Sequence, residues 1–139
     1  MKWVTRVFFA LLALPAIAGL GFYLRPVSYL NAHVYLQEHF VGIESRNIKV
    51  DGFRMHYLAT GPASGPPVVL VHGLGGRAED WWNVAPVLAK AGFRVYMPDL
   101  LGFGRSQQPA DFSYSVRDQA AVIVAFMDAL DIKQADIAG

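Results

Sequence analysis

The feature that most constrains this chain is the uninterrupted aliphatic run VVLV at residues 68–71. A strand with one solvated face would alternate apolar and polar side chains. A run without alternation is typical of a strand that is buried on both faces of a parallel sheet. Parallel strands need crossover connections, usually helices, so this run predicts an α/β fold.

The segment before this run predicts an antiparallel hairpin over residues 43–61. Two alternating segments flank Asp51-Gly52, a dipeptide that is typical of tight hairpin turns. Met55 and Tyr57 share one face of the second strand, and His56 belongs to the other. We interpret His56 as part of the polar side of an outer strand.

The segment after the run predicts two helices and two further strands. A helix is expected to begin near Asn83, a buried strand to span residues 94–100, and a third strand to begin in residues 135–139. Ser115, three residues before Asp118, predicts the capped start of a second helix. One apolar stripe of that helix is expected to face the core: Val116, Ala120, Ile123, Met127 and Leu130.

Residues 7–24 form an 18-residue stretch without a charged side chain. As a helix it would span about 27 Å, close to the ~30 Å hydrocarbon core of a bilayer. We expect residues 1–26 to be a retained, single-pass transmembrane signal anchor. A cleaved signal peptide ending near Ala18 and a buried core helix are the alternatives. The surplus of positive charge before the stretch favours a cytoplasmic N-terminus, with the globular part on the extracytoplasmic side.

The chain is thereby divided into three parts. Residues 27–43 predict an amphipathic juxtamembrane segment, either at the membrane surface or packed on the globular part. Residues 44–139 form the globular part. Basic residues outnumber acidic ones only in residues 1–26, so the globular part lacks the positive surface of a nucleic-acid binder, and no nucleic-acid partner is expected.

The glycine-rich loop HGLGG, residues 72–76, follows the first buried strand. Glycines let main-chain N–H groups converge on one point, where they can bind a phosphate or an oxyanion. Ala78 stands where a dinucleotide fingerprint needs glycine, and Arg77-Ala78 where a Walker loop needs Lys-Ser/Thr. The oxyanion interpretation remains.

This loop, the segment DLLGFGRS at residues 99–106, the capped helix and the strand that ends at Gly139 together resemble the α/β-hydrolase fold superfamily. The similarity runs from about residue 45 to residue 139. Among its branches, the N-terminal anchor resembles the monoacylglycerol-lipase-like serine esterases and lipases. The resemblance implies an antiparallel first hairpin followed by parallel strands with helices.

The resemblance also implies roles for the loop residues. The backbone N–H of Leu74 matches the family's first oxyanion donor, Gly73 and Gly75 shape the loop, and His72 is structural. Gly139 matches the first glycine of the family's G-x-S-x-G nucleophile elbow, so the nucleophile is expected just after it. We therefore expect this chain to be the N-terminal part of a longer hydrolase, without catalytic residues of its own and inactive by itself.

Two further polar residues are interpreted as structural. Gly104-Arg105-Ser106 imitates the start of an elbow, but Gln108 replaces the second glycine, so Ser106 is not expected to be a nucleophile. Asp99 is interpreted as a turn-forming carboxylate that bonds nearby backbone N–H groups.

The sequence thus predicts a membrane-anchored α/β-hydrolase that acts on small-molecule or lipid esters through a serine. It predicts no cofactor and no metal. The first alternative is a member with an aspartate nucleophile, such as an epoxide hydrolase or a dehalogenase. Leu74 argues against the dehalogenases, which often carry Asn after His-Gly. The second alternative is a non-catalytic protein or truncated fragment.

Overall fold

The computed structural model of the chain describes residues 17–28, 32 and 42–139, which belong to two compact units, residues 1–40 and 41–139. In the first unit, residues 17–24 and 26–28 are helical. Large apolar side chains there are exposed: Ile17, Leu20, Phe22, Tyr23, Leu24 and Val27.

Most of the predicted anchor, residues 1–16, and most of the predicted amphipathic segment lie outside the described residues. None of the helices that the structure does describe is long and apolar enough to cross a bilayer. The anchor therefore stays a prediction.

The second unit begins with the predicted hairpin. Strand β1 (Glu44–Val50) pairs antiparallel with β2 (Phe53–Thr60), and Asp51 and Gly52 form the turn with φ values of 48° and 89°. Positive φ at both central residues suits the right-handed twist of the strands, which is why Asp-Gly serves here. The hairpin prediction is confirmed.

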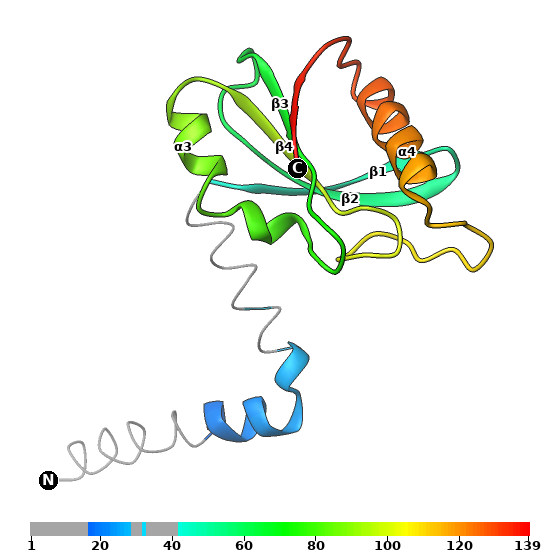
Figure 1. Ribbon diagram of the computed structural model, residues 1–139. Helices are drawn as coiled ribbons and strands as arrows, with labels where there is room; N and C mark the ends of the chain where they lie inside the picture. Colours follow the sequence, from blue (N-terminus) through cyan, green and yellow to red (C-terminus); the bar gives the residue numbers. More distant parts are fainter. Residues whose placement is uncertain (1–16, 29–31, 33–41) are drawn as a thin grey trace, which may run out of the picture. The chain divides into compact units, whose positions relative to one another are not determined.

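The five strands form one mixed sheet in the order β1-β2-β4-β3-β5 (Figure 1). The other three are β3 (Pro67–Leu70), β4 (Arg94–Pro98) and β5 (Asp136–Ala138). Strand β3 lies parallel to both β4 and β5, whereas β2 pairs antiparallel with β4. The chain thus leaves β3 toward β4 and later returns to the other side of β3. A reversal of this kind creates a crevice at the carboxyl ends of the strands, where open α/β sheets bind their ligands.

The helices cover the two faces of the sheet (Figure 1). On one face, the short 3₁₀ helix η1 (Ala78–Trp81) and α3 (Ala85–Lys90) surround a core that includes Leu58, Leu70 and Met97. On the other, α4 (Val116–Ala129) packs over a core that includes Met55, Tyr57 and Val69. Because both faces are covered, β3 can be uniformly apolar, as predicted.

Helix α4 begins as predicted, but its buried face differs. Ser115 Oγ accepts a hydrogen bond from Asp118 N at 3.1 Å, which confirms the N-cap. The buried side chains are Gln119, Val122, Ile123 and Phe126, whereas Val116 is 88% exposed. The predicted stripe was wrong except at Ile123, with Met127 and Leu130 only partly buried against the core. The spacing of apolar residues permitted either stripe, and packing against the sheet selected one of them.

Candidate active site

The loop after β3 is a tight turn that presents backbone amides. Gly76 N donates to Gly73 O at 3.0 Å, and Gly75 has φ of +77° at the third position of the turn. These features are those of a type II turn, which favours glycine at that position. Gly75 therefore shapes the turn through its positive φ, whereas at Gly73 neither the φ angle nor the surrounding space requires glycine.

Leu74 occupies the second position of this turn and projects away from the core. Its side chain is 98% exposed. Within the described part of the chain, no acceptor receives a hydrogen bond from its backbone N–H. Because this donor has no acceptor among the described residues, it is available to a ligand.

His72 is buried, and both of its ring nitrogens have partners. Leu100 N donates to Nε2 at 3.0 Å, so this nitrogen carries no proton, and Nδ1 lies 2.8 Å from Gly73 O, to which it donates. The neutral ring thus connects the loop after β3 to the loop after β4. This geometry agrees with a structural histidine and leaves no nitrogen for proton transfer.

The end of β5 lies beside the same loop. Val71 N donates to Ala138 O at 2.8 Å, which extends the parallel pairing to the last residues of both strands. A Cβ added to Gly139 would lie 2.9 Å from Val71 O, so the close approach of the two backbones requires glycine here. Gly139 and Leu74 line one cavity.

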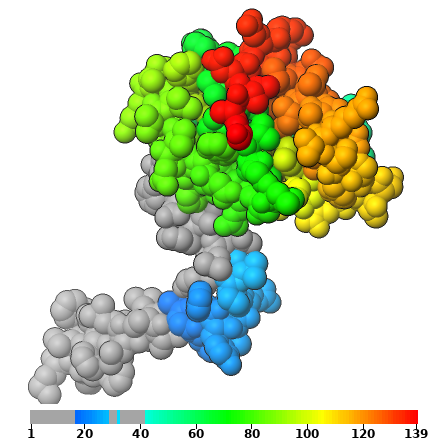
Figure 2. Space-filling view, viewed as in Figure 1, coloured from blue at the N-terminus to red at the C-terminus, as the bar shows by residue number. Residues whose placement is uncertain are grey.

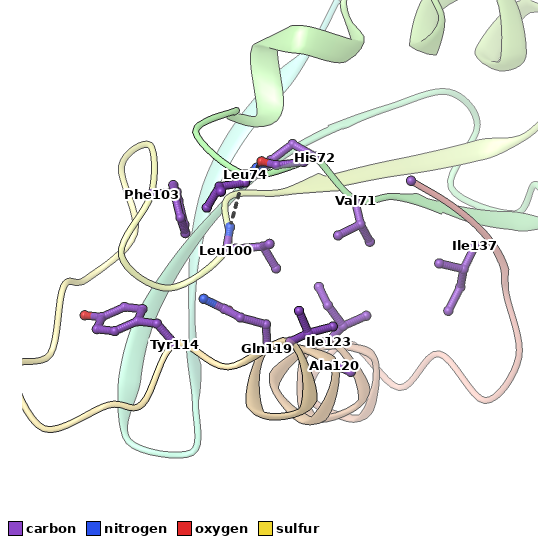
Figure 3. A pocket seen from close by; sticks show the side chains of 13 residues that line it. Val71, His72, Leu74, Leu100, Phe103, Tyr114, Gln119, Ala120, Ile123 and Ile137 are labelled. Atoms are coloured by element: carbon purple, nitrogen blue, oxygen red, sulfur yellow. Dashed lines mark hydrogen bonds between the residues drawn. The ribbon is translucent and has the colours of Figure 1, made fainter.

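This cavity has a volume of about 420 Å³ and lies between the loop, β5 and α4 (Figure 3). Figure 3 shows Leu74 and His72 on one side, Gln119, Ala120 and Ile123 of α4 across from them, and Ile137 of β5 at a third side. The other large side chains of the lining are Val71, Leu100, Phe103, Tyr114 and Val116. The lining is mostly apolar, so the cavity suits an apolar group.

The polar side chains in this lining form hydrogen bonds with the backbone, and only one of their polar atoms, Oε1 of Gln119, has no partner among the described residues. Tyr114 Oη donates to Pro109 O, and Gln119 Nε2 donates to Leu101 O, both at under 3 Å. Gln119 Oε1 is buried and has no partner among the described residues. Sequence reasoning did not identify Gln119, because it placed this residue outside the apolar stripe of the helix.

A second polar cluster surrounds Asp99, which follows β4 and is fully buried. Its carboxylate accepts hydrogen bonds from Ala78 N at 2.7 Å and Arg105 N at 2.9 Å, which confirms the expected bonds to the backbone. It also accepts one from His56 Nδ1 at 2.7 Å. Burial alone would raise the pKa of Asp99, but the His56 imidazole and the two amides together hold that pKa below its ordinary value.

The interpretation of His56 as the polar side of an outer strand was therefore wrong. The residue is buried, and its ring provides a hydrogen bond to the buried carboxylate of Asp99. Alternation alone shows which face a side chain takes and not whether that face is covered.

Ser106 is buried in the same cluster. Its Oγ donates to Asp99 O at 2.7 Å and accepts from His56 N at 2.8 Å. Both hydrogen bonds of the hydroxyl group therefore go to the backbone and attach the loop after β4 to β2. This arrangement agrees with the expectation that Ser106 is not a nucleophile.

Residues 66–139 match the sequence profile of the family described as alpha/beta hydrolase fold. The chain belongs to the α/β-hydrolase fold family. The haloalkane dehalogenase of Mycobacterium marinum is 43% identical over 79 residues, a match of 55% of this chain and 26% of the relative. The 2-hydroxymuconate semialdehyde hydrolase of Pseudomonas sp. strain CF600 is 40% identical over 97 residues, covering 68% of this chain and 33% of the relative.

Among solved structures, a membrane phospholipase A, described as a bacterial virulence factor, superimposes with a TM-score of 0.79 at 29% identity. The match covers 97% of this chain and 43% of that protein. The chain thus spans between a quarter and a half of the length of these three proteins.

Proposed function

We propose that the whole protein is a serine hydrolase of carboxylic esters and that this chain supplies the first half of its oxyanion hole. The observation that carries the proposal is the backbone N–H of Leu74, which has no acceptor among the described residues and lies next to the end of β5, on the wall of the same cavity. In the whole protein, a nucleophile just after Gly139 would stand at the carboxyl end of β5, beside this amide.

The proposed chemistry uses the amide in the transition state. A serine oxygen attacks the acyl carbon, and the carbonyl oxygen becomes negatively charged. The Leu74 N–H donates to this oxygen, which stabilises the tetrahedral intermediate more than the substrate. The intermediate then expels the alcohol, and water releases the acid.

We further propose that the substrate is a lipid ester and that the protein is anchored in a membrane by residues 1–26, with its globular part on the extracytoplasmic side. The apolar lining of the cavity supports an acyl group there. The exposed apolar side chains of residues 17–27 support contact with lipid. The similarity to a membrane phospholipase A extends over nearly the whole chain, the N-terminal unit included, and supports both proposals.

The alternative is an aspartate nucleophile in the same position. The similarity to a haloalkane dehalogenase favours it, since the match at 43% identity is high. The two hypotheses predict different products, so the whole protein should be assayed for free fatty acid from lipid esters and for halide from haloalkanes. Halide release without ester hydrolysis would refute the serine hypothesis.

The test of the oxyanion role is Leu74→Pro in the whole protein. Proline lacks the N–H yet suits the second position of a type II turn, so the loop is expected to keep its shape. Loss of one oxyanion donor costs about 2.7–4 kcal/mol of transition-state stabilisation, or about 10²–10³ in kcat. We expect this loss in ester hydrolysis.

Leu74→Ala is the matched control, because it shortens the same side chain and keeps the N–H. We expect its kcat to stay within a few-fold of wild type. Equal losses in the two variants would show that the leucine side chain matters and that the amide does not.

A further inference from the structure

Three side chains outside the cavity form a continuous hydrogen-bonded series. Asp99 Oδ2 lies 2.7 Å from His56 Nδ1, and His56 Nε2 lies 2.9 Å from Ser45 Oγ. The carboxylate and the imidazole are buried, whereas Ser45 is exposed. We propose that Ser45 is a second nucleophile of this protein, activated by His56 and able to take an acyl or phosphonyl group from an activated ester.

The hydrogen bonds determine where the protons lie. The Asp99 carboxylate accepts from Ala78 N and Arg105 N, so its third bond, at Nδ1 of His56, is also one that it accepts. The ring proton is therefore on Nδ1, and Nε2 is an acceptor in the neutral ring. Ser45 Oγ–H donates to this nitrogen, which is the arrangement of a nucleophile and its general base.

Arg105 adds a positive charge next to the hydroxyl oxygen. One of its guanidinium nitrogens donates to Ser45 Oγ at 3.3 Å, and the other lies 2.8 Å from Glu79 Oε1. Oγ thus donates to an imidazole and accepts from a cation. A cation at this distance stabilises the negative charge that develops on Oγ as its proton leaves.

The fold makes this serine accessible from outside. Strand β1 is the first strand of the sheet and pairs, among the described residues, only with β2. In that pairing Asn47 lies opposite His56, so Ser45 is the diagonal neighbour of His56 on the same face. Neither Ser45 nor His56 lines the cavity beside Leu74, so this site is separate from the proposed active site.

The proposed step with a fluorophosphonate is a single displacement. An Oγ–P bond forms, the P–F bond breaks, fluoride leaves with the electron pair, and the hydroxyl proton passes to His56 Nε2. With an activated carboxylic ester such as an aryl ester, Oγ bonds to the acyl carbon instead of phosphorus. The phenolate then leaves with the electron pair instead of fluoride.

The chain contains matched serines for the test. Ser113 and Ser115 are also exposed, but both hydroxyls donate to the carboxylate of Asp118 rather than to an imidazole. The whole protein would be treated with an alkyl fluorophosphonate and digested, and the labelling rate of each serine would be followed by mass spectrometry of its peptide. General-base assistance is worth about 10²–10⁴, so we expect Ser45 to be labelled at least about 100-fold faster than Ser113 or Ser115.

His56→Asn tests the base without removing the donor to Asp99. The side-chain N–H₂ of asparagine can take the place of Nδ1–H toward the carboxylate, but nothing replaces Nε2. We expect this variant to stay folded, as judged by its urea midpoint, and Ser45 labelling to fall to the rate of Ser113. Equal labelling of Ser45 and Ser113 in the wild type, or unchanged labelling of Ser45 in folded His56→Asn, would overturn the proposal.

Because each serine is measured in its own peptide, a labelled serine elsewhere in the whole protein does not affect this result. Ser45→Ala, at an exposed position, would abolish the labelling of this peptide and so confirm that the label is on Oγ of Ser45.

Discussion

At the scale of single residues, Asp99 shows how a buried charge is stabilised by its neighbours. It is fully buried, yet its carboxylate has a donor at both oxygens: an imidazole and two backbone amides. A buried ion is tolerated only with partners of this kind. The cluster joins β2, η1 and the loop after β4, so it holds that loop against the sheet.

We expect Asp99→Asn to lower the free energy of unfolding by about 1.5–3 kcal/mol, the range for hydrogen bonds to a charged group. The asparagine side chain has only one oxygen. Its N–H₂ group would face at least one N–H that now donates to the carboxylate, and that hydrogen bond would be lost. Urea unfolding followed by tryptophan fluorescence would measure the change. Asp111→Asn, at an exposed position, is the control and should change stability by less than about 0.5 kcal/mol.

The wild type and Asp99→Asn are also expected to differ in how their stability depends on pH. The pKa of Asp99 is lower in the folded protein than its ordinary value, so the unfolded chain binds more protons in the interval between the two values. The stability contributed by Asp99 is therefore complete above about pH 4 and is lost as the pH falls through the folded-state pKa. The free energy of unfolding should drop more steeply below about pH 4 in the wild type than in Asp99→Asn. Parallel curves would contradict this account.

At the scale of elements, the start of α4 depends on side chains just before it. Ser115 Oγ accepts from Asp118 N, while Ser115 N donates to Ser113 Oγ. The reciprocal bond of a full capping box, from Ser115 N to the side chain of Asp118, is replaced by this bond to Ser113. A serine hydroxyl two residues upstream thus accepts the bond that the Asp118 carboxylate would accept in a full capping box.

Ser115→Ala should lower the free energy of unfolding by about 1 kcal/mol, because the amide of Asp118 loses its acceptor at the helix start. Ser64→Ala, at an exposed position between β2 and β3, removes a hydroxyl of the same kind away from any helix end. Thermal unfolding of the two variants would separate the cap from the mere loss of a surface hydroxyl. A similar loss in both would show that the cap contributes nothing of its own.

At the scale of the whole molecule, the last strand of the sheet is its most exposed. Strand β5 lies at the end of the strand order, and Ile137 is 58% exposed. In Figure 2 the last residues, in red, lie on the surface beside α4, in orange. An unpaired, apolar strand edge is a template for association with another chain.

We expect the 139-residue chain to self-associate and Ile137→Lys to reduce this association, since a charge on an edge strand opposes pairing. Val124→Lys introduces the same charge at a residue of α4 that is 60% exposed and serves as the control. Sedimentation velocity over a range of concentrations would compare the three proteins. Equal behaviour of the two variants would show that added charge, and not the edge of β5, governs the association.

Much of the fold could be predicted from the sequence, because its signals are local. The Asp51-Gly52 turn, the aliphatic run of β3 and the Ser115 cap each depend on residues that are neighbours in the chain. The loop of residues 72–76 could be predicted for the same reason, since the conformation of a tight turn is decided by its own glycines.

Other features depend on residues that are distant in the chain. The bond between His56 and Asp99 joins residues 43 positions apart, and the approach of Gly139 to Val71 joins residues 68 positions apart. The sequence by itself determined which segments become strands, helices and glycine turns, because those preferences arise from backbone sterics and side-chain periodicity within a few residues. Only the tertiary structure decided which face of α4 is buried, that His56 lies inside and that Leu74 shares a cavity with the end of β5. Those outcomes follow from the order of the strands in the sheet, which brings distant segments together and which no local pattern encodes.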